Sequence, residues 1–306
     1  MNAARTPLDE ARGLWLGALG VLIFAMTLPM TRLAVGPAAD PQLPPLFVTF
    51  GRAAFAGLAS LLYLAATRAP RPQPGQFGAL AVCAAGTVLG FPGFLAYALR
   101  EVDAMHAAVI TGVLPLATAI AAALHFRQRP SNAFWACAAL GCALVIAYAA
   151  VQGGGRLVAA DGLLLLAVAS AAIGYVAGAR LSAQMRAEQV ICWVLVGSLP
   201  LTAPVALATW PTAPVRASAW AGFGYVALFS MWLGFFAWYR GLALGGTVRV
   251  SQVQLIQPFL ALVFAVPVLG ETLAPSTVLF SLAVIATVFL GRRAPAGTPA
   301  PDRRTR

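Results

Sequence analysis

Polar side chains at helical spacing inside an apolar run are the residues of this sequence that could do chemistry. In the run 245–272, Ser251, Gln254 and Gln257 fall on one side of a helix, and Pro258 interrupts the run near its middle. An amide group costs free energy in hydrocarbon unless it is hydrogen-bonded, so we expect both glutamines to face the interior of a helix bundle. There they either line a solute cavity or form purely structural bonds between helices.

A second run, 104–130, has the same plan, with Pro115 at its centre, 143 residues before Pro258 in a chain of 306. A proline lacks the amide that would bond to the carbonyl group four residues earlier, which frees the carbonyl groups of Thr111 and Gln254. In a bilayer these groups need a neighbouring helix, a water molecule or a solute. We interpret the two prolines as paired hinges at mid-membrane and Thr111 as a further hydrogen-bonding residue. The alternative is a tolerated kink that the nearby side chain satisfies.

Arg52 stands six residues into the predicted helix 46–66, roughly 9 Å from its start at 1.5 Å per residue. A charged side chain at the centre of a membrane helix costs about 2.5–3.5 kcal/mol. The side chain therefore either extends to the interface or points inward. In the second case its guanidinium would suit a carboxylate or phosphate group of a substrate.

Aromatic residues near the helix ends complete the candidate site. Tyr97, Trp238 and Tyr239 either belong to the aromatic belt at the membrane interface or form the wall of a site for a flat or amphipathic solute. The hypothesis for a substrate site thus comprises Arg52, Tyr97, Thr111, Trp238, Tyr239, Gln254 and Gln257, with Pro115 and Pro258 as hinges.

The composition places these residues in a membrane protein. Hydrophobic residues make up 60% of the chain and charged residues 9%. Successive apolar runs of about 20 residues suit helices that cross a bilayer, where backbone amides must be paired within the segment. Small residues four positions apart, such as Gly86/Gly90 and Gly174/Gly178, predict close helix contacts. We predict an all-α integral membrane protein with ten transmembrane helices, at 13–35, 46–66, 77–99, 104–130, 133–151, 163–179, 190–209, 219–239, 245–272 and 273–290.

The arginines predict how these helices are oriented. Fifteen of the 20 lie at the N-terminus, in the tail or in alternate connections, four lie on the opposite side, and Arg52 lies within a helix. Positive residues stay on the cytoplasmic side of a membrane. We therefore expect a multi-pass protein of the cell (inner) membrane with both termini in the cytoplasm. Five helices per half require the second repeat to be inverted relative to the first. We expect repeats at 12–151 and 161–291 around a central cavity, and a disordered cytoplasmic tail at 292–306.

Other chemistries lack support in the sequence. No phosphate-binding loop is present, no cysteine spacing matches a metal or redox motif, and the net charge of +11 comes from dispersed arginines. His106 and His125 are 19 residues apart, about 28 Å along one helix, and each is expected at a membrane interface. We therefore predict no metal, no cofactor and no nucleic-acid partner. No Asp or Glu lies in the middle of a predicted helix, which favours a facilitator or exchanger over an ion-driven pump.

Three stretches carry a resemblance to a known family: FGRAAFAGLASLL, FLAYALREVDAMHAAVITGVLPL and FFAWYRGLALGGTVRVSQVQLIQPFLALVFAVPVLGETL. The chain resembles the EamA-type permeases of the drug/metabolite transporter superfamily over residues 12–291, in two copies. The resemblance implies ten helices around a central cavity and export or facilitated movement of small metabolites. Members usually carry Glu 13 residues after the proline of each copy, whereas this chain has Glu271 in the second copy and Gln128 in the first.

The sequence thus favours a permease for small metabolites, an exporter or facilitator of amino-acid-like or other small polar compounds that works by alternating access. One alternative is a non-transporting membrane partner or sensor subunit, which would lack a hydrated cavity. The other is a membrane-embedded enzyme, for which the predicted helices supply no cluster of catalytic groups at one depth.

Overall fold

The structure, a computed structural model, describes residues 7–125, 131–152, 154, 156–182, 184–245, 250 and 252–293. Eight helical spans are long and apolar enough to cross a membrane: Leu8–Val35, Pro45–Ala66, Pro74–Glu101, Ala104–His125, Asn132–Gln152, Ala159–Ser182, Glu188–Ala208 and Ala217–Gly241. Two shorter apolar helices, Val253–Leu269 and Pro275–Leu290, follow them. The prediction of an all-α membrane protein with ten transmembrane helices is confirmed.

Several spans are built from more than one helical segment. Span 1 consists of α1 (Pro7–Ala25) and α2 (Thr27–Val35), span 2 of α3 (Pro45–Ala66), span 3 of η1 (Pro74–Gln76), α4 (Phe77–Cys83), η2 (Ala84–Gly90) and α5 (Phe91–Glu101), span 4 of α6 (Ala104–Thr111) and α7 (Leu114–His125), and span 5 of α8 (Asn132–Gln152). Span 6 is α9 (Ala159–Ser182), span 7 is α10 (Ala187–Ala208), span 8 is α11 (Ala217–Tyr225), η3 (Val226–Leu233) and α12 (Gly234–Gly245), span 9 is η4 (Gln252–Ile256) and α14 (Gln257–Leu269), and span 10 is α15 (Pro275–Arg293).

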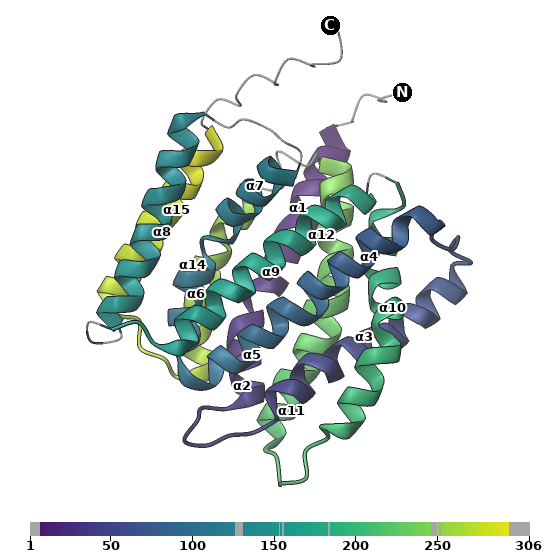
Figure 1. Cartoon of the computed structure of the whole chain (residues 1–306), viewed down its shortest axis with the longest axis horizontal. Coiled ribbons are helices and arrows are strands. Elements are labelled where there is room, and N and C mark those ends of the chain that lie inside the picture. Colours follow the sequence, from purple (N-terminus) through teal and green to yellow (C-terminus); the bar gives the residue numbers. More distant parts are fainter. Residues whose placement is uncertain are drawn as a thin grey trace, which may run out of the picture.

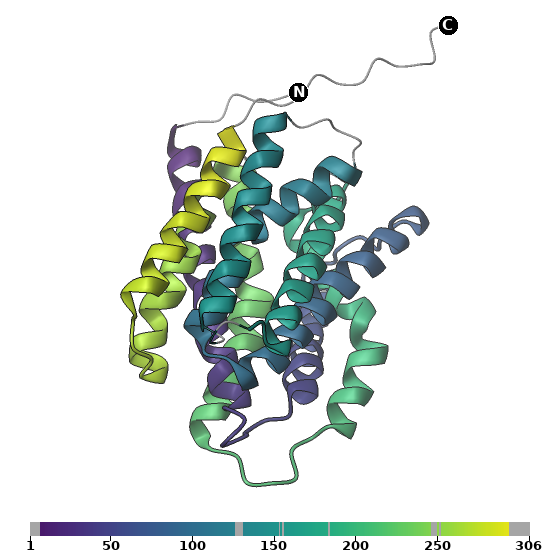
Figure 2. The ribbon, with the colours of Figure 1, turned by 60° about the vertical axis from the view of Figure 1, so that its left-hand side comes forward.

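The two halves cross the membrane in opposite directions. The first turn of α1 and the last turn of α15 both lie at the upper end of the bundle in Figure 1, and Figure 2 shows the same arrangement from another side. The connections 36–44, 102–103, 209–216 and 270–274 lie at the other end, which we call the lower face. Five spans carry the first half from the upper face to the lower face, so the second half starts at the lower face and is inverted.

The main contacts between the two halves are symmetric: each main contact of a span of the first half with a span of the second has an equivalent in which the two halves swap roles. α1 packs along α12 and α5 packs along α9, which pairs span 1 with span 8 and span 3 with span 6. α3 packs along α10, α6 on α14 and α8 along α15, which pairs spans 2, 4 and 5 with spans 7, 9 and 10. This is the contact pattern of two halves related by a two-fold axis. The α8–α15 pair forms one side of the bundle (Figure 1).

Besides the turn at Met26 between α1 and α2 and the 3-10 turn η1, four segments depart from α-helical geometry, at equivalent positions in the two halves. η2 in span 3 and η3 in span 8 are π-helical. Span 4 is interrupted between α6 and α7, and span 9 begins with the 3-10 turn η4 before α14. Pro115 and Pro258 are the second residues of α7 and α14, where a helix needs no amide. The α-helical pattern thus stops and restarts just before each proline.

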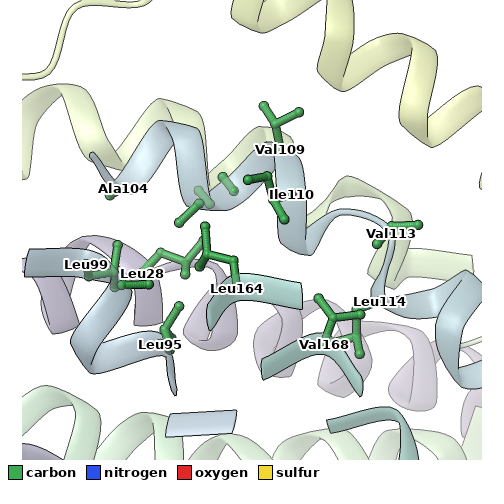
Figure 3. Packing of buried hydrophobic residues seen from close by; sticks show 14 of the residues in the cluster. Leu28, Leu95, Leu99, Ala104, Val109, Ile110, Val113, Leu114, Leu164 and Val168 are labelled. Carbon is green, nitrogen blue, oxygen red and sulfur yellow. The ribbon is translucent and has the colours of Figure 1, made fainter. Parts of the chain in front are cut away.

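Buried apolar side chains from both halves surround α6. Figure 3 shows Val109 and Ile110 of α6 in one cluster with Leu95 of α5 and Leu164 and Val168 of α9. Ile110, Leu95 and Leu164 are fully buried. In a bilayer such packing stabilises helix contacts mainly through dispersion, because lipid chains already solvate apolar surface. Span 4 is thus held on both sides, and its position is tied to span 6 of the other half.

Glycines bring spans 3 and 6 into close contact, as the sequence predicted. A methyl group added at Gly86 would lie 2.7 Å from the backbone nitrogen of Gly174, and one added at Gly174 would lie 2.9 Å from the nitrogen of Thr87. Both distances are shorter than a carbon–nitrogen contact allows, so the two backbones approach each other only because side chains are absent.

Three sequence predictions concern positions outside the described residues: the side of Ser251, the role of Gln128 and the disorder of residues 294–306. The predicted tail began at 292, but α15 continues to Arg293. Span 6 also begins four residues earlier than the predicted 163. This earlier start brings Asp161 into the first turn of α9, where its exposed fraction is 3%.

Replacing Gly174 by Ala should destabilise the protein by about 1–3 kcal/mol, because the methyl group must displace the backbone of span 3. The measurement is the thermal unfolding midpoint in detergent. Gly162→Ala is the matched control in the same helix, since a methyl group there meets no atom of the described residues within 4 Å. Equal midpoints for the two variants would contradict the close contact.

Candidate functional site

A cavity of about 70 Å³ lies between the two halves. Its walls come from spans 1, 2, 3 and 4 of the first half and from spans 6, 8 and 9 of the second. All four irregular segments contribute to it: Thr87 from η2, Gly112 from the break in span 4, Ser230 from η3 and Gln254 from η4. The volume holds a few water molecules, whereas pockets for metabolite-sized ligands measure about 300–1,000 Å³. The halves must therefore move apart to admit such a solute.

Arg52 of α3 reaches this cavity with an exposed fraction of 3%. Its Nη2 donates to the Ser230 hydroxyl at 3.0 Å, and that hydroxyl lies 2.8 Å from Oγ1 of Thr27. Its Nε and Nη1 are buried and have no hydrogen-bond partner among the described residues. None of the described residues that line the cavity is Asp or Glu. The guanidinium is thus a buried positive charge with two free donors and no counter-charge, an arrangement that is costly unless an anion or water supplies the missing interactions.

Three further predicted residues line the same cavity: Gln254, Gln257 and Thr111. Oε1 of Gln257 is buried without a partner among the described residues, so the cavity also offers a hydrogen-bond acceptor. The Thr111 hydroxyl donates to the carbonyl oxygen of Ala107 in its own helix at 2.7 Å. The threonine therefore satisfies a local carbonyl, and only its acceptor lone pairs are left for a solute.

The two predicted hinge prolines also line the cavity, and the two helix breaks touch. A methyl group added at Gly112 would lie 3.5 Å from the ring of Pro258. The break in span 4 of the first half therefore packs against the break in span 9 of the second half.

The predicted aromatic walls lie elsewhere. Tyr97 is 43% exposed and Trp238 packs with Val21 and Val250. Tyr239 packs between that cluster and Phe235. None of the three lines the cavity. The aromatic residues that do line it are Phe24, Phe91, Tyr175 and Phe235.

Ser230 and Thr27 escaped the sequence analysis although they hold Arg52. Hydroxyl side chains in membrane helices commonly bond to their own backbone, as Thr111 does here, so a serine or threonine in an apolar run indicates little. The π-helical turn η3, which presents Ser230 to the cavity, has no recognisable sequence signal.

Links between the halves close the lower face below this cavity. Glu271, in the connection after α14, accepts hydrogen bonds from the backbone nitrogens of Ala104 at 2.7 Å and Met105 at 2.8 Å. It therefore caps the first turn of α6 in the other half, where the helix dipole favours a negative charge. Arg216 of the second half pairs with Asp40 of the first at 2.8 Å. Both links thus join the first half to the second at the lower face.

A bundle of ten spans in two inverted halves, with interrupted helices meeting at a central cavity that holds a few polar side chains, is an architecture typical of membrane transporters. The chain belongs to the EamA-like transporter family, whose sequence profile matches residues 11–149 and 158–291. This confirms the resemblance on the three quoted stretches. The protein is thus a multi-pass membrane transporter and not an enzyme, and its partners include the bilayer and a small-molecule substrate.

Two similar proteins support this assignment. The chain is 42% identical over 279 residues to a Bacillus subtilis (strain 168) protein named "Uncharacterized transporter YdeK", an alignment that covers 90% of this chain and 96% of the relative. A solved structure titled only "Crystal structure of protein" matches with a TM-score of 0.63 at 17% identity and covers 92% of this chain and 98% of its own. At that identity the second match shows the fold alone.

Replacing Ser230 by Ala should lower the thermal unfolding midpoint, because Arg52 Nη2 and the Thr27 hydroxyl both lose their partner. The expected loss is about 1–3 kcal/mol, the usual cost of leaving a buried polar group unpaired. Ser198→Ala is the control, since that buried hydroxyl donates to the Val194 carbonyl in its own helix at 2.7 Å. A loss no larger than that of the control would show that Ser230 does not hold the guanidinium.

Proposed function

We propose that this transporter moves small amino-acid-like solutes across the cell membrane, as an exporter or facilitator, by alternating access to the central cavity. The observation that carries the proposal is the buried Arg52 guanidinium with Nε and Nη1 unpaired at the cavity. An anionic group in the cavity would accept from an unpaired donor of the guanidinium and neutralise its charge.

The rest of the lining supports a solute that also carries a hydrogen-bond donor and an apolar part. Oε1 of Gln257 is a free acceptor, which suits an N–H group of the solute. Phe24, Phe91 and Phe235 provide apolar wall beside these polar groups. A carboxylate, an amino or amide group and a small apolar side chain together match this set, and such a molecule is amino-acid-like.

Arginine positions support an orientation with the upper face in the cytoplasm. Arg68, Arg71 and Arg186 belong to connections of that face, whereas the lower face carries the paired Arg32 and Arg216. We therefore place both termini in the cytoplasm of the inner membrane and take 12–151 and 161–291 as the repeats that rock against each other. The contact between Gly112 and Pro258 would be the point about which they bend.

Flux into liposomes that contain the purified protein tests the proposal, with amino acids and their derivatives as solutes. Arg52→Gln should reduce flux of carboxylate-bearing solutes at low concentration by about 10- to 100-fold, the loss expected for one or two charge-assisted hydrogen bonds of 1.5–3 kcal/mol. Arg52→Lys should retain part of it, because the charge is kept.

Arg71→Gln, which changes an exposed arginine of the upper face, is the matched control and should leave flux unchanged. Undiminished flux in Arg52→Gln would reject the assignment of the site. Absence of flux for every solute class in protein that is folded and correctly inserted would favour a non-transporting partner subunit.

A further inference from the structure

A buried acid–base pair joins the two halves at the lower face, outside the central cavity. Nε2 of His106 lies 2.6 Å from Oδ1 of Asp161, and the two side chains are 11% and 4% exposed. His106 belongs to the first turn of α6 in the first half, and Asp161 to the first turn of α9 in the second. The other carboxylate oxygen accepts from the backbone nitrogen of Val158 at 2.9 Å, which fixes Asp161 at the start of its own helix. The sequence analysis expected His106 at the membrane interface; it lies in the first turn of its span at the lower face, where it is buried against this carboxylate.

A second cavity, of about 810 Å³, lies beside the pair and gives it a route to water. The groups that face the pair from the surrounding elements are Glu101 of α5, Asp103 before α6, Tyr148 and Gln152 of α8, Glu271 before α15 and Thr277 of α15. Asp103 is paired with Arg32 at 3.3 Å, and the Tyr148 ring lies 5.3 Å from the His106 ring. None of the described residues that line this cavity is Lys or Arg. The surroundings are therefore acidic.

Both ends of α6 have a role in the transporter. At its first turn, Asp161 holds His106 and Glu271 holds the Ala104 and Met105 amides, and both carboxylates come from the other half. At its last turn, Thr111 lines the central cavity. The helix has eight residues, about 12 Å at 1.5 Å per residue, so a movement of its first turn reaches the cavity wall.

We propose that the His106–Asp161 pair is a proton-binding site, and that proton uptake there holds α6 in place over the lower end of the central cavity. The neutral imidazole donates its Nε2–H to the carboxylate, and Nδ1 takes a proton from hydronium in the adjacent cavity, which leaves water. The pair changes from a net charge of −1 to zero, and a hydrogen bond becomes an ion pair. This inference goes beyond the proposed function, because it concerns residues outside the solute cavity and a different ligand.

Lower pH should favour the closed lower face. The ion pair and the acidic surroundings stabilise the added positive charge only while α6 stays against α9, so proton uptake and closure promote each other. Glu271 contributes in the same direction. Burial raises the pKa of its carboxyl, and the Met105 and Ala104 amides oppose that rise without cancelling it. An arrangement with a raised pKa binds more protons than one in which the carboxyl is hydrated, so it gains stability as pH falls.

Proton binding can be observed directly, because the chain has only two histidines. In protein labelled with 15N in the imidazole rings, one signal should move as pH is lowered, disappear in His106→Gln and respond differently to pH in Asp161→Asn. His125→Gln removes the other signal and completes the assignment. A His106 signal that does not respond to pH, or that Asp161→Asn leaves unchanged, would overturn the proposal.

Coupling to α6 is tested by the distance between nitroxide labels on Val102→Cys and Thr272→Cys, in protein lacking the four native cysteines. The population with a short distance should grow as pH falls, and this dependence should vanish in His106→Gln and persist in His125→Gln. A label-to-label distance that does not change with pH would overturn the coupling. A pH dependence of this distance that remains in His106→Gln but is lost in Glu271→Gln would overturn it as well. No solute is added, so these outcomes are independent of the proposed substrate.

Discussion

Backbone polar groups have no partner in lipid, and this constraint organises the whole molecule. A helix that breaks at the depth of the membrane must place its unpaired amides and carbonyls against protein or water. Spans 3, 4, 8 and 9 all depart from regular helical geometry, and all four departures face one central cavity. Because the second half is inverted, the irregular segments of spans 3 and 4 find counterparts in spans 8 and 9 across the two-fold axis.

The cavity concentrates one unpaired charge at its centre. Arg52 is anchored by Ser230 and, through it, by Thr27, so a residue of span 2 is held by spans 8 and 1. The anchor fixes the direction of the guanidinium, while the remaining donors stay unsatisfied. A site of this kind favours an anionic group strongly and gains little from a neutral one.

Much of this could be predicted from the sequence, because a polar residue in an apolar run has few places to go. Gln254 and Gln257 were expected to face the bundle interior and Arg52 either the interior or the interface, and all three line the cavity. The ten spans and their inversion followed from hydropathy and arginine positions. The interruption of spans 4 and 9 near Pro115 and Pro258 was also predictable, whereas the role of the two prolines as hinges stays a prediction.

Other features depend on three-dimensional contacts without a local signal. Aromatic residues pack equally well against lipid, protein or solute, so Tyr97, Trp238 and Tyr239 could not be separated from Phe24 or Phe91. The partner of His106 lies 55 residues away and in a segment that hydropathy assigns to a connection. Its carboxylate becomes buried only because α9 extends beyond its apolar stretch, which a window of hydrophobicity does not detect.

Labelling from the two faces tests the central claim, that one cavity between inverted halves opens alternately to each side. Thr111 lines the cavity, and its neighbour Ile110 is fully buried in the packed core, so Thr111→Cys and Ile110→Cys form a matched pair in protein without native cysteines. A membrane-impermeant thiol reagent applied to right-side-out and to inside-out vesicles should modify the Thr111→Cys protein from both faces and the Ile110→Cys protein from neither. Modification of the Thr111→Cys protein from one face only, or from none, would contradict the account.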